Sequence, residues 1–325
     1  MAKITLKNGI TFECATDQII LDAAKQNGIA IEHSCRTGRC GVCATTVLSG
    51  DTVAMSPETS EIGDSHGELM ILTCCRAPVA DLELGIEDLG EIGKLQTVTL
   101  PCRIDNLDML NEAVLELTLR LPPTANFKFV AGQYINLIGE DGLKRSYSIA
   151  NSPAKDGKII LHIKCVKNGM MSDYLFNRAK KNDLLRFEGP LGTFSFRKDD
   201  SKNVVFLATG TGIAPVKSIL EDLQHKNIDK NVIVIWGGRY LGDLYWRTSC
   251  ISLPHQYIPV LSRELNWLGF RGYVQNALLD LELDLASTTV YACGSEFMIK
   301  DASSLLIQNG LPLDRFHSDA FVSSN

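Results

Sequence analysis

The sequence lacks features that would each define a class of protein. No apolar run is long enough to cross a membrane, so no membrane-spanning helix is expected. Basic residues are not in excess, because 38 acidic residues outnumber 32 basic ones, and nucleic-acid binding is not expected on this balance. The first residues, Met-Ala-Lys-Ile-Thr-Leu-Lys-Asn-Gly, contain no apolar core of a secretion signal. We therefore expect a cytoplasmic protein.

Cysteine, by contrast, is frequent. Ten cysteines in a chain of 325 residues with no export signal indicate reduced thiols and a metal site, not a disulfide framework. Cys35, Cys40 and Cys43 follow the spacing C-x₄-C-x₂-C, and Cys74 and Cys75 come later in Leu-Thr-Cys-Cys-Arg. This is the plant-type arrangement for a [2Fe–2S] cluster. The sequence therefore predicts that the first three cysteines and one of the later pair are ligands.

A structural zinc site is the alternative for these cysteines. Zinc sites favour two C-x₂-C units, and this region contains one. Gly38 and Gly41 support the cluster, because glycine can adopt positive φ and let backbone N–H groups approach the sulfurs. Since such a cluster moves one electron at a time, the sequence predicts a redox protein.

Residues 1–93 form the first predicted domain, a small α+β fold of β-grasp-like type. A hairpin turns at Asn8-Gly9, and Asp17 is the expected N-cap of a helix that ends at Gly28. A strand at 82–86 closes the domain. Acidic residues outnumber basic ones in this domain, which indicates either simple solubility or a docking face for a basic redox partner.

Residues 94–199 and 200–325 form two further predicted domains. The first contains alternating apolar and polar runs, such as 114–121 and 159–166, and these predict an antiparallel β-barrel. The second begins with the continuous apolar run 204–208, and its strands alternate with helices. That pattern predicts an α/β domain with a parallel sheet buried on both faces.

Two motifs in the barrel segment are candidates for a flavin site. In Arg145-Ser-Tyr-Ser, the arginine can pair with a phosphate, the ring of Tyr147 can cover a flavin, and Ser148 can hydrogen-bond near flavin N5. Taken alone, the motif is more typical of a surface turn than of a flavin site. Asn168-Gly-Met-Met-Ser is expected to open a helix whose start binds phosphate through a free hydroxyl. The residues predicted there are Gly169, Met170, Met171 and Ser172. Gly189-Pro-Leu-Gly-Thr-Phe adds a turn that could approach a cofactor.

The last domain has a glycine-rich loop between a strand and a helix. Gly210, Thr211 and Gly212 are expected to bind the pyrophosphate of a dinucleotide, although a tight turn without a ligand is the alternative. Cys293 and Gly294 end a second buried strand at the carboxyl edge, where ligands bind in such sheets. A lone cysteine at this place is also typical of simple packing.

In this order, the motifs resemble the ferredoxin–NADP⁺ reductase superfamily, and among its members those with an N-terminal plant-type ferredoxin domain. The stretches that carry the resemblance are the cysteine motif with Cys74, R-S-Y-S-I-A-N, N-G-M-M-S, G-P-L-G-T-F, G-T-G-I-A-P and A-C-G. The resemblance implies FAD as the flavin and NADH as the donor. It makes Cys74 the fourth ligand, because relatives commonly have glutamine at the position of Cys75. It also implies that Cys293 lies near the nicotinamide, that Ser148 and Cys293 are catalytic, and that Phe321 of the tail contacts a cofactor.

The implied activity is electron transfer from NADH through FAD and the [2Fe–2S] cluster to a partner protein. Stretches such as Ala131-Gly-Gln-Tyr-Ile and Ala214-Pro-Val-Lys-Ser are similar to reductases of the CDP-6-deoxy-Δ3,4-glucoseen type, of 3,6-dideoxyhexose biosynthesis, whose partner is a dehydratase. One alternative is the reductase component of an aromatic-ring or alkane oxygenase. Another is an iron–sulfur carrier or sensor without its own turnover. NADH is the expected donor because Arg239 is followed by acidic Asp243, which leaves no strong pocket for a 2′-phosphate.

Overall fold

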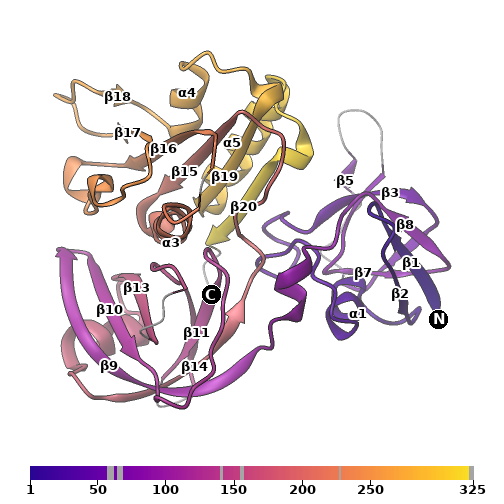
Figure 1. Ribbon diagram of the computed structural model, residues 1–325, viewed down its shortest axis with the longest axis horizontal. Helices are drawn as coiled ribbons and strands as arrows, with labels where there is room; N and C mark the ends of the chain where they lie inside the picture. The colour runs from indigo at the N-terminus through magenta and orange to yellow at the C-terminus, as the bar shows by residue number, and fades with distance from the viewer. Residues whose placement is uncertain (57–61, 64–68, 140–141, 154–156, 227, 322–325) are drawn as a thin grey trace. The chain divides into compact units, whose positions relative to one another are not determined.

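The structure is a computed structural model that describes residues 1–56, 62–63, 69–139, 142–153, 157–226 and 228–321. The chain divides into two compact units (Figure 1). The first contains residues 1–96 with Gly192–Phe194, and the second contains Thr97–Leu191 with Ser195–Phe321. Among the described residues, no helix is both long enough and apolar enough to span a membrane.

The first unit contains a mixed sheet with the strand order β2-β1-β8-β3-β6-β5. Its strands are β1 (Ala2–Leu6), β2 (Thr11–Cys14), β3 (Ala44–Ser49), β5 (Ile62–Gly63), β6 (Leu69–Leu72) and β8 (Leu82–Leu84). The predicted hairpin is confirmed, with Gly9 at φ +80° between β1 and β2. The closing strand is confirmed as well, because β8 pairs in parallel with β1. A separate ribbon pairs β4 (Thr52–Ala54) with β7 (Arg76–Pro78).

The helix of the first unit, α1 (Ile20–Gln26), begins later than predicted. Asp17 is not its N-cap: the N-cap position is Ile19, and no side chain caps it. The backbone N–H of Gln18 donates to the carbonyl of Ala15 at 3.0 Å, so Asp17 lies within a turn that precedes the helix. The predicted end is confirmed, because Gly28 adopts φ +72° just after the last turn.

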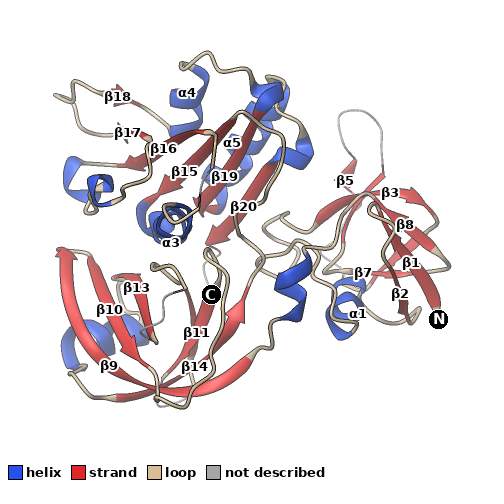
Figure 2. Cartoon of the chain, viewed as in Figure 1, coloured by secondary structure: helices blue, strands red, loops and turns tan. Residues whose placement is uncertain are grey.

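The segment predicted as a barrel folds into a six-stranded antiparallel sheet (Figure 2), in the order β12-β11-β14-β9-β10-β13. The strands are β9 (Val98–Asn111), β10 (Val114–Arg120), β11 (Tyr134–Ile138), β12 (Lys144–Ser148), β13 (Lys158–Lys164) and β14 (Leu184–Leu191). An antiparallel bridge between Ile149 and Leu161 joins the end of β12 to β13, the two edge strands. This bridge closes the barrel around fully buried side chains such as Leu117, Ile135 and Phe187.

A short helical segment follows β13. It consists of α2 (Met170–Asp173) and a π-helical turn, η2 (Tyr174–Arg178). The sequence prediction that Asn168-Gly-Met-Met-Ser opens a helix is confirmed. Asn168 reaches the left-handed region, at φ +62°, just before the helix begins.

The final segment forms a parallel six-stranded sheet with helices, as predicted. Its strand order is β18-β17-β16-β15-β19-β20. The strands are β15 (Asn203–Thr209), β16 (Asn231–Gly238), β17 (Gln256–Leu261), β18 (Phe270–Arg271), β19 (Thr288–Ser295) and β20 (Phe316–Phe321), and the helices are α3 (Ile213–Leu223), α4 (Val274–Leu279) and α5 (Glu296–Gln308). Strands 15, 16 and 19 are buried along almost their whole length. The chain runs outward from β15 to β18 and then returns to β19 on the other side, so the strand order reverses between β15 and β19.

Short 3₁₀ turns connect several elements. They are η1 (Gly90–Lys94), η3 (Gly210–Gly212), η4 (Leu241–Asp243), η5 (Thr248–Cys250), η6 (Leu285–Ser287) and η7 (Leu313–Arg315). Of these, η3 matters most for function, because it joins β15 to α3 at the reversal of strand order. In sheets of this kind the ligand crevice lies at the carboxyl ends of the strands at such a reversal.

Candidate cofactor sites

The four predicted cluster cysteines form two pairs. A side-chain hydrogen bond joins Cys35 and Cys40, and each backbone N–H of this pair also points at the other sulfur, at 3.5 and 3.4 Å. The sulfurs of Cys43 and Cys74 lie 3.2 Å apart. All four are free thiols, as are the other cysteines of the chain. The structure thus brings the late cysteine of the sequence onto the loop that carries the early three.

Backbone amides surround these sulfurs. The N–H of Thr37 donates to Cys35 Sγ at 3.4 Å, and the N–H of Gly38 donates to Cys74. Gly38 and Gly41 have φ of +78° and +75°, the left-handed conformation that was predicted for them. Hydrogen bonds favour thiolate in one member of each pair. The bond from Cys40 lowers the pKa of Cys35 to about 4, and the bond from Cys43 lowers the pKa of Cys74 to about 6.

The donor set fits a dinuclear cluster better than a single ion. In a [2Fe–2S] centre four thiolates serve two irons, two to each. The two pairs match that requirement. The arrangement in two pairs therefore favours the dinuclear cluster over the zinc alternative.

Cys75 lies beside the predicted fourth ligand. Its sulfur is 3.3 Å from that of Cys74, and both side chains are buried. Cys74 is the member of this pair that reaches Cys43. The geometry therefore favours Cys74 as the ligand and leaves Cys75 as its immediate neighbour.

The first unit also includes part of the predicted Gly-Pro-Leu-Gly-Thr-Phe turn. Within this unit, the hydroxyl of Thr193 accepts a hydrogen bond from the backbone N–H of His33 at 2.8 Å and donates to the His33 carbonyl at 2.9 Å. His33 is two residues from Cys35. Thr193 is thus bonded to the backbone at the start of the cluster loop.

The flavin motif lies on β12, the strand that ends next to the bridge that closes the barrel. Arg145 and Tyr147 are half-buried, and Ser148 is buried at the end of the strand. Burial raises the pKa of Tyr147 to about 12, so its hydroxyl stays protonated. Arg145 makes a hydrogen bond to the Lys144 carbonyl at 2.9 Å and keeps further N–H groups that could meet an anion. The motif is part of a strand, not the surface turn considered above.

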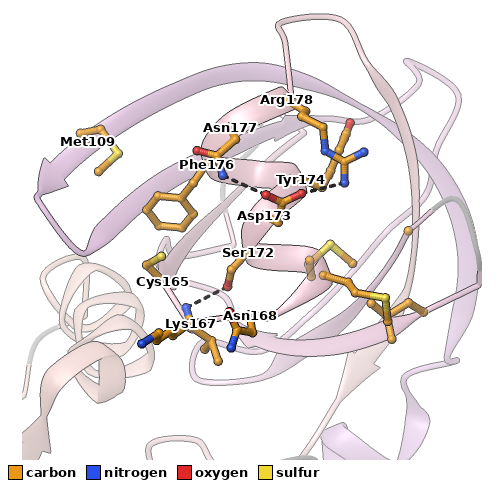
Figure 3. A pocket seen from close by; sticks show the side chains of 16 residues that line it. Met109, Cys165, Lys167, Asn168, Ser172, Asp173, Tyr174, Phe176, Asn177 and Arg178 are labelled. Atoms are coloured by element: carbon orange, nitrogen blue, oxygen red, sulfur yellow. Dashed lines mark hydrogen bonds and ion pairs between the residues drawn. The ribbon is translucent and has the colours of Figure 1, made fainter.

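A pocket of about 700 Å³ surrounds the start of α2 (Figure 3). This volume lies in the range of small-molecule sites. Gly169, Met170, Met171 and Ser172 all line it, together with basic Lys167 and Arg178. Gly139 and Leu143, between β11 and β12, line it as well. Leu143 of this pocket is two residues from Arg145 in the chain. The pocket is therefore a candidate site for the part of FAD that lies beyond the isoalloxazine ring.

One detail at this helix start differs from the prediction. The hydroxyl of Ser172 is not free, because it accepts a hydrogen bond from the backbone N–H of Val166 at 3.0 Å (Figure 3). Its remaining hydrogen is what it could offer to a phosphate. Gly169 lies so close to this turn that a Cβ would be 3.1 Å from the Val166 carbonyl. The glycine is therefore needed for close packing of the turn against the helix.

The dinucleotide motifs meet at the reversal of strand order. Ala208 at the end of β15 is the register partner of Cys293 on β19. A Cβ on Gly212 would lie 2.1 Å from the carbonyl oxygen of Cys293, and one on Gly294 would lie 2.1 Å from Thr209 Oγ1. At Gly212 backbone therefore packs directly on backbone, and at Gly294 backbone packs on the side chain of Thr209. The structure brings Gly210–Gly212 and Cys293-Gly294 together, at the place where a crevice for a ligand is expected.

Cys293 itself is fully buried. Burial first, and the charge of Asp319 second, raise its pKa well above the usual range, so the thiol is neutral. Phe321 ends β20, the next strand, and is 37% exposed. The thiol is thus buried within the sheet, and a role in hydride transfer requires it to act at short range through packing.

Strand β16 adds one residue next to Gly210 that had no predicted role. Trp236 is fully buried on β16, and its Nε1–H donates to the Gly210 carbonyl at 3.0 Å. Asp243 accepts the N–H groups of Arg239 and Tyr240 at 2.7 and 3.0 Å, which holds the turn after β16. Trp236 could have been noticed as a large aromatic residue in a buried strand, but its partner is 26 residues away in the sequence.

Fold and sites together define a class: a flavin- and pyridine-nucleotide-dependent oxidoreductase with an N-terminal iron–sulfur domain. The domain families that match have the same order. The 2Fe-2S iron-sulfur cluster binding domain covers residues 4–79, the Oxidoreductase FAD-binding domain covers 101–196, and the Oxidoreductase NAD-binding domain covers 206–304.

Whole-chain relatives narrow the class. The chain is 42% identical over 322 residues to the CDP-6-deoxy-L-threo-D-glycero-4-hexulose-3-dehydrase reductase of Yersinia pestis, covering 98% of this chain and 97% of that one. It is 31% identical over 324 residues to the terephthalate 1,2-dioxygenase reductase component 1 of Comamonas sp, covering 97% and 95%. The Amycolatopsis cytochrome P450 reductase GcoB has a similar fold, with a TM-score of 0.74 at 24% identity over all of both chains.

The chain belongs to the ferredoxin-reductase family that these relatives represent, as a member of the CDP-6-deoxy-Δ3,4-glucoseen reductase type. It is an electron-transfer reductase, in which electrons pass from NAD(P)H through FAD to a [2Fe–2S] cluster. The predicted fold class and cofactors are thereby confirmed. The individual ligand and binding residues, and the exact domain boundaries, stay predictions.

The first prediction concerns the cluster. We expect Cys40→Ala to abolish it, because one iron loses a thiolate, while flavin reduction by NADH persists. We expect Cys75→Ser to retain it. Iron content and the electron paramagnetic resonance of the reduced protein measure both. Loss of the signal in Cys75→Ser together with its retention in Cys74→Ser would show that the fourth ligand is assigned to the wrong residue.

The second prediction concerns the flavin. Arg145→Ala removes a charge-assisted contact worth about 1.5–3 kcal/mol, so flavin retention should fall by tenfold or more. Lys144→Met, at the adjacent exposed position, is the control and should retain flavin. Chromatography of the released cofactor should give FAD. FMN as the dominant species would contradict the assignment of the pocket at α2 to the second half of the flavin.

The third prediction concerns Cys293. Cys293→Ala leaves a gap under the nicotinamide position, so we expect stopped-flow flavin reduction to slow much more than dinucleotide binding weakens. Cys102→Ala removes an equally buried thiol from the barrel and serves as the control. If both variants are reduced at the wild-type rate, Cys293 is a packing residue only.

Proposed function

We propose that this chain uses NADH to deliver single electrons to a partner enzyme that acts on a CDP-6-deoxyhexose. The observation that carries the proposal is the 42% identity to a dehydrase reductase along essentially the whole of both chains. The chemistry agrees with it. A nicotinamide donates two electrons together, whereas a [2Fe–2S] cluster transfers them one at a time, so the acceptor is a protein that needs single electrons.

In this proposal the residues of the two units have distinct tasks. Cys35 and Cys40 hold one iron, and Cys43 and Cys74 hold the other, with the loop amides stabilising the anionic centre. On the second unit, Arg145 and the α2 segment bind the flavin phosphates, while Tyr147 and Ser148 contact the ring. Gly210, Thr211 and Gly212 bind the dinucleotide, and Gly294 lets it lie close to Cys293 and Phe321.

NADH is the proposed donor, on the charge at the end of β16. In nucleotide-binding sheets an acidic side chain beyond the first helix favours a ribose 2′-hydroxyl, whereas a 2′-phosphate needs basic partners. Asp243 places a carboxylate beside the exposed Arg239, to whose N–H it is bonded. A doubly charged phosphate at this turn would meet that carboxylate.

The cytoplasm is the proposed compartment, and the state of the thiols supports it. All ten cysteines are free, including the exposed Cys165 and Cys250. Such a chain keeps its thiols in a reducing environment, which supports the cytoplasm as the place of work.

An oxygenase component is the second candidate acceptor. It is favoured by the 31% identity to the terephthalate dioxygenase reductase component, again over nearly the full length. The two candidates share every step inside this chain and differ in the surface that the partner recognises. The possibility of a carrier without turnover is set aside, because the chain has the family's complete reductase architecture.

The fourth prediction concerns the acceptor. With NADH under anaerobic conditions, NADH oxidation should depend on both a purified dehydrase and its CDP-6-deoxyhexulose substrate. NADPH in the same assay should give a lower kcat/KM. The cluster-free Cys40→Ala variant should not support the reaction although its flavin is still reduced.

The matched arm replaces the dehydrase by an aromatic-ring oxygenase component and its substrate. Stimulation there, without stimulation by the dehydrase, would transfer the proposal to the oxygenase class. A higher kcat/KM for NADPH would overturn the donor assignment while leaving the acceptor assignment intact.

A further inference from the structure

Helix α3 does more than follow the dinucleotide loop. Three of its side chains are bonded to the segment that follows the flavin strand. Lys217 Nζ donates to the Ala150 carbonyl at 2.8 Å, and Ser218 Oγ donates to the Asn151 carbonyl at 2.7 Å. Glu221 accepts the backbone N–H of Ser152 at 3.0 Å and also pairs with Lys217. We name Lys217, Ser218 and Glu221 the α3 clamp.

The segment that the clamp holds is itself rigid. Ile149 forms the bridge that closes the barrel, and the N–H of Ala150 donates to the Ile160 carbonyl at 2.7 Å. The side chain of Asn151 accepts from the N–H of Ile160 at 2.8 Å and donates to two carbonyls. Ala150 and Asn151 follow Ser148 directly, so a displacement of this segment is passed to the flavin motif.

Burial makes the clamp costly to break. Ser218 is fully buried, and the side chain of Lys217 is only 12% exposed. A polar group at such a place is stable only if its partners are present. Lys217 uses two of its three N–H donors, one on a carbonyl of the barrel and one on the carboxylate of Glu221. The clamp therefore stabilises one placement of α3 relative to the barrel segment, and other placements are less stable because they leave these buried polar groups without partners.

The clamp connects the two segments that are proposed to bind the nicotinamide and the flavin. On one side, α3 begins immediately after Gly210–Gly212, and Figure 1 shows it between the parallel sheet and the barrel. On the other side, the clamped segment is the continuation of β12, which carries Arg145, Tyr147 and Ser148. We propose that Lys217, Ser218 and Glu221 are positioning residues that set the placement of the nicotinamide loop against the flavin strand.

Hydride transfer is sensitive to such placement. Reacting atoms must approach to about 3–3.5 Å, and a misplacement of about 1 Å can cost a hundredfold in rate. The clamp residues touch neither cofactor loop directly, so they act through backbone position. The inference rests on the NAD(P)H-to-FAD step of this chain and is independent of which acceptor the cluster serves.

The fifth prediction tests the clamp with the FAD-loaded protein and no acceptor. Lys217→Met keeps the length of the side chain and removes its charge, and Ser218→Ala is the milder variant. In stopped-flow reduction by NADH, both should lower the limiting rate by about tenfold or more, while the Kd of the dinucleotide changes less than threefold. Lys217→Arg should restore much of the rate, because it can donate to the same carbonyl and carboxylate.

Lys226→Met is the control. Lys226 is exposed, follows the end of α3, and pairs with Asp222 in the last turn of that helix and not with the barrel segment. Its reduction rate should equal that of the wild type. Flavin content of every variant is measured first, so that a loss of FAD is not taken for a loss of alignment.

A second readout does not depend on turnover. The N–H of Ser152 is bonded to Glu221. Hydrogen–deuterium exchange of the peptide that contains residues 149–152 should therefore accelerate in Lys217→Met and in Ser218→Ala and stay unchanged in Lys226→Met.

Faster exchange with a lower reduction rate supports the proposal. Faster exchange or a lower melting temperature with a wild-type reduction rate overturns it and reduces the clamp to a structural contact. A rate loss that follows FAD loss or Kd alone also overturns it. If Lys217→Met does not fold, Ser218→Ala and Lys217→Arg decide between these outcomes.

Discussion

The nucleotide-binding half depends on a contact between two pieces of backbone. Gly212 and the carbonyl of Cys293 approach so closely that no Cβ fits between them, and Gly294 leaves no room for a Cβ beside the side chain of Thr209. These contacts join η3 and the end of β15 to β19, the neighbouring strand at which the strand order reverses. They fix where η3 turns and in which direction α3 leaves the sheet. Trp236 completes the arrangement from β16 through its bond to Gly210.

A different constraint, backbone conformation, applies around the sulfurs of the first unit. Gly38 and Gly41 adopt positive φ, and the N–H of Gly38 donates to Cys74. The pairing of Cys43 with Cys74 then joins β3 to the turn after β6, since Thr73 N–H also donates to the Cys43 carbonyl at 3.1 Å. Backbone hydrogen bonds thus help to hold the loop of the cluster cysteines in its shape, independently of a bound cluster.

Much of the fold could be predicted from the sequence because its signals are local. Apolar runs placed β10 and β15 within a residue or two, and the order of short motifs indicated three domains. The start of α1 was missed, because a turn at Ala15–Gln18 competes with Asp17 for the backbone. The Ser172 hydroxyl was expected to be free. Its partner, Val166, comes into reach only because Asn168 adopts a left-handed conformation, which no pattern of residue types announces.

Contacts between segments that are far apart in the sequence could not be predicted from the motifs. The choice between Cys74 and Cys75 depends on which sulfur the fold turns toward Cys43. The stretch Ala214-Pro-Val-Lys-Ser could be recognised as part of a family pattern, but the partners of Lys217 and Ser218 lie 67 residues away. Spacing within a motif predicts the conformation of a loop well. It does not predict which segment the following helix packs against.

The pairing of Lys217 with Glu221 has a consequence for how this lineage can vary. Losing either partner alone would leave the other as a charge largely removed from water, at a cost of about 3–5 kcal/mol. Replacing both with apolar residues removes the uncompensated charge, but it takes the bonded partners away from the Ala150 carbonyl and the Ser152 N–H. A path from the charged pair to an uncharged one therefore crosses an unstable single mutant. Positions 217 and 221 are expected to covary among homologues and to change together or not at all.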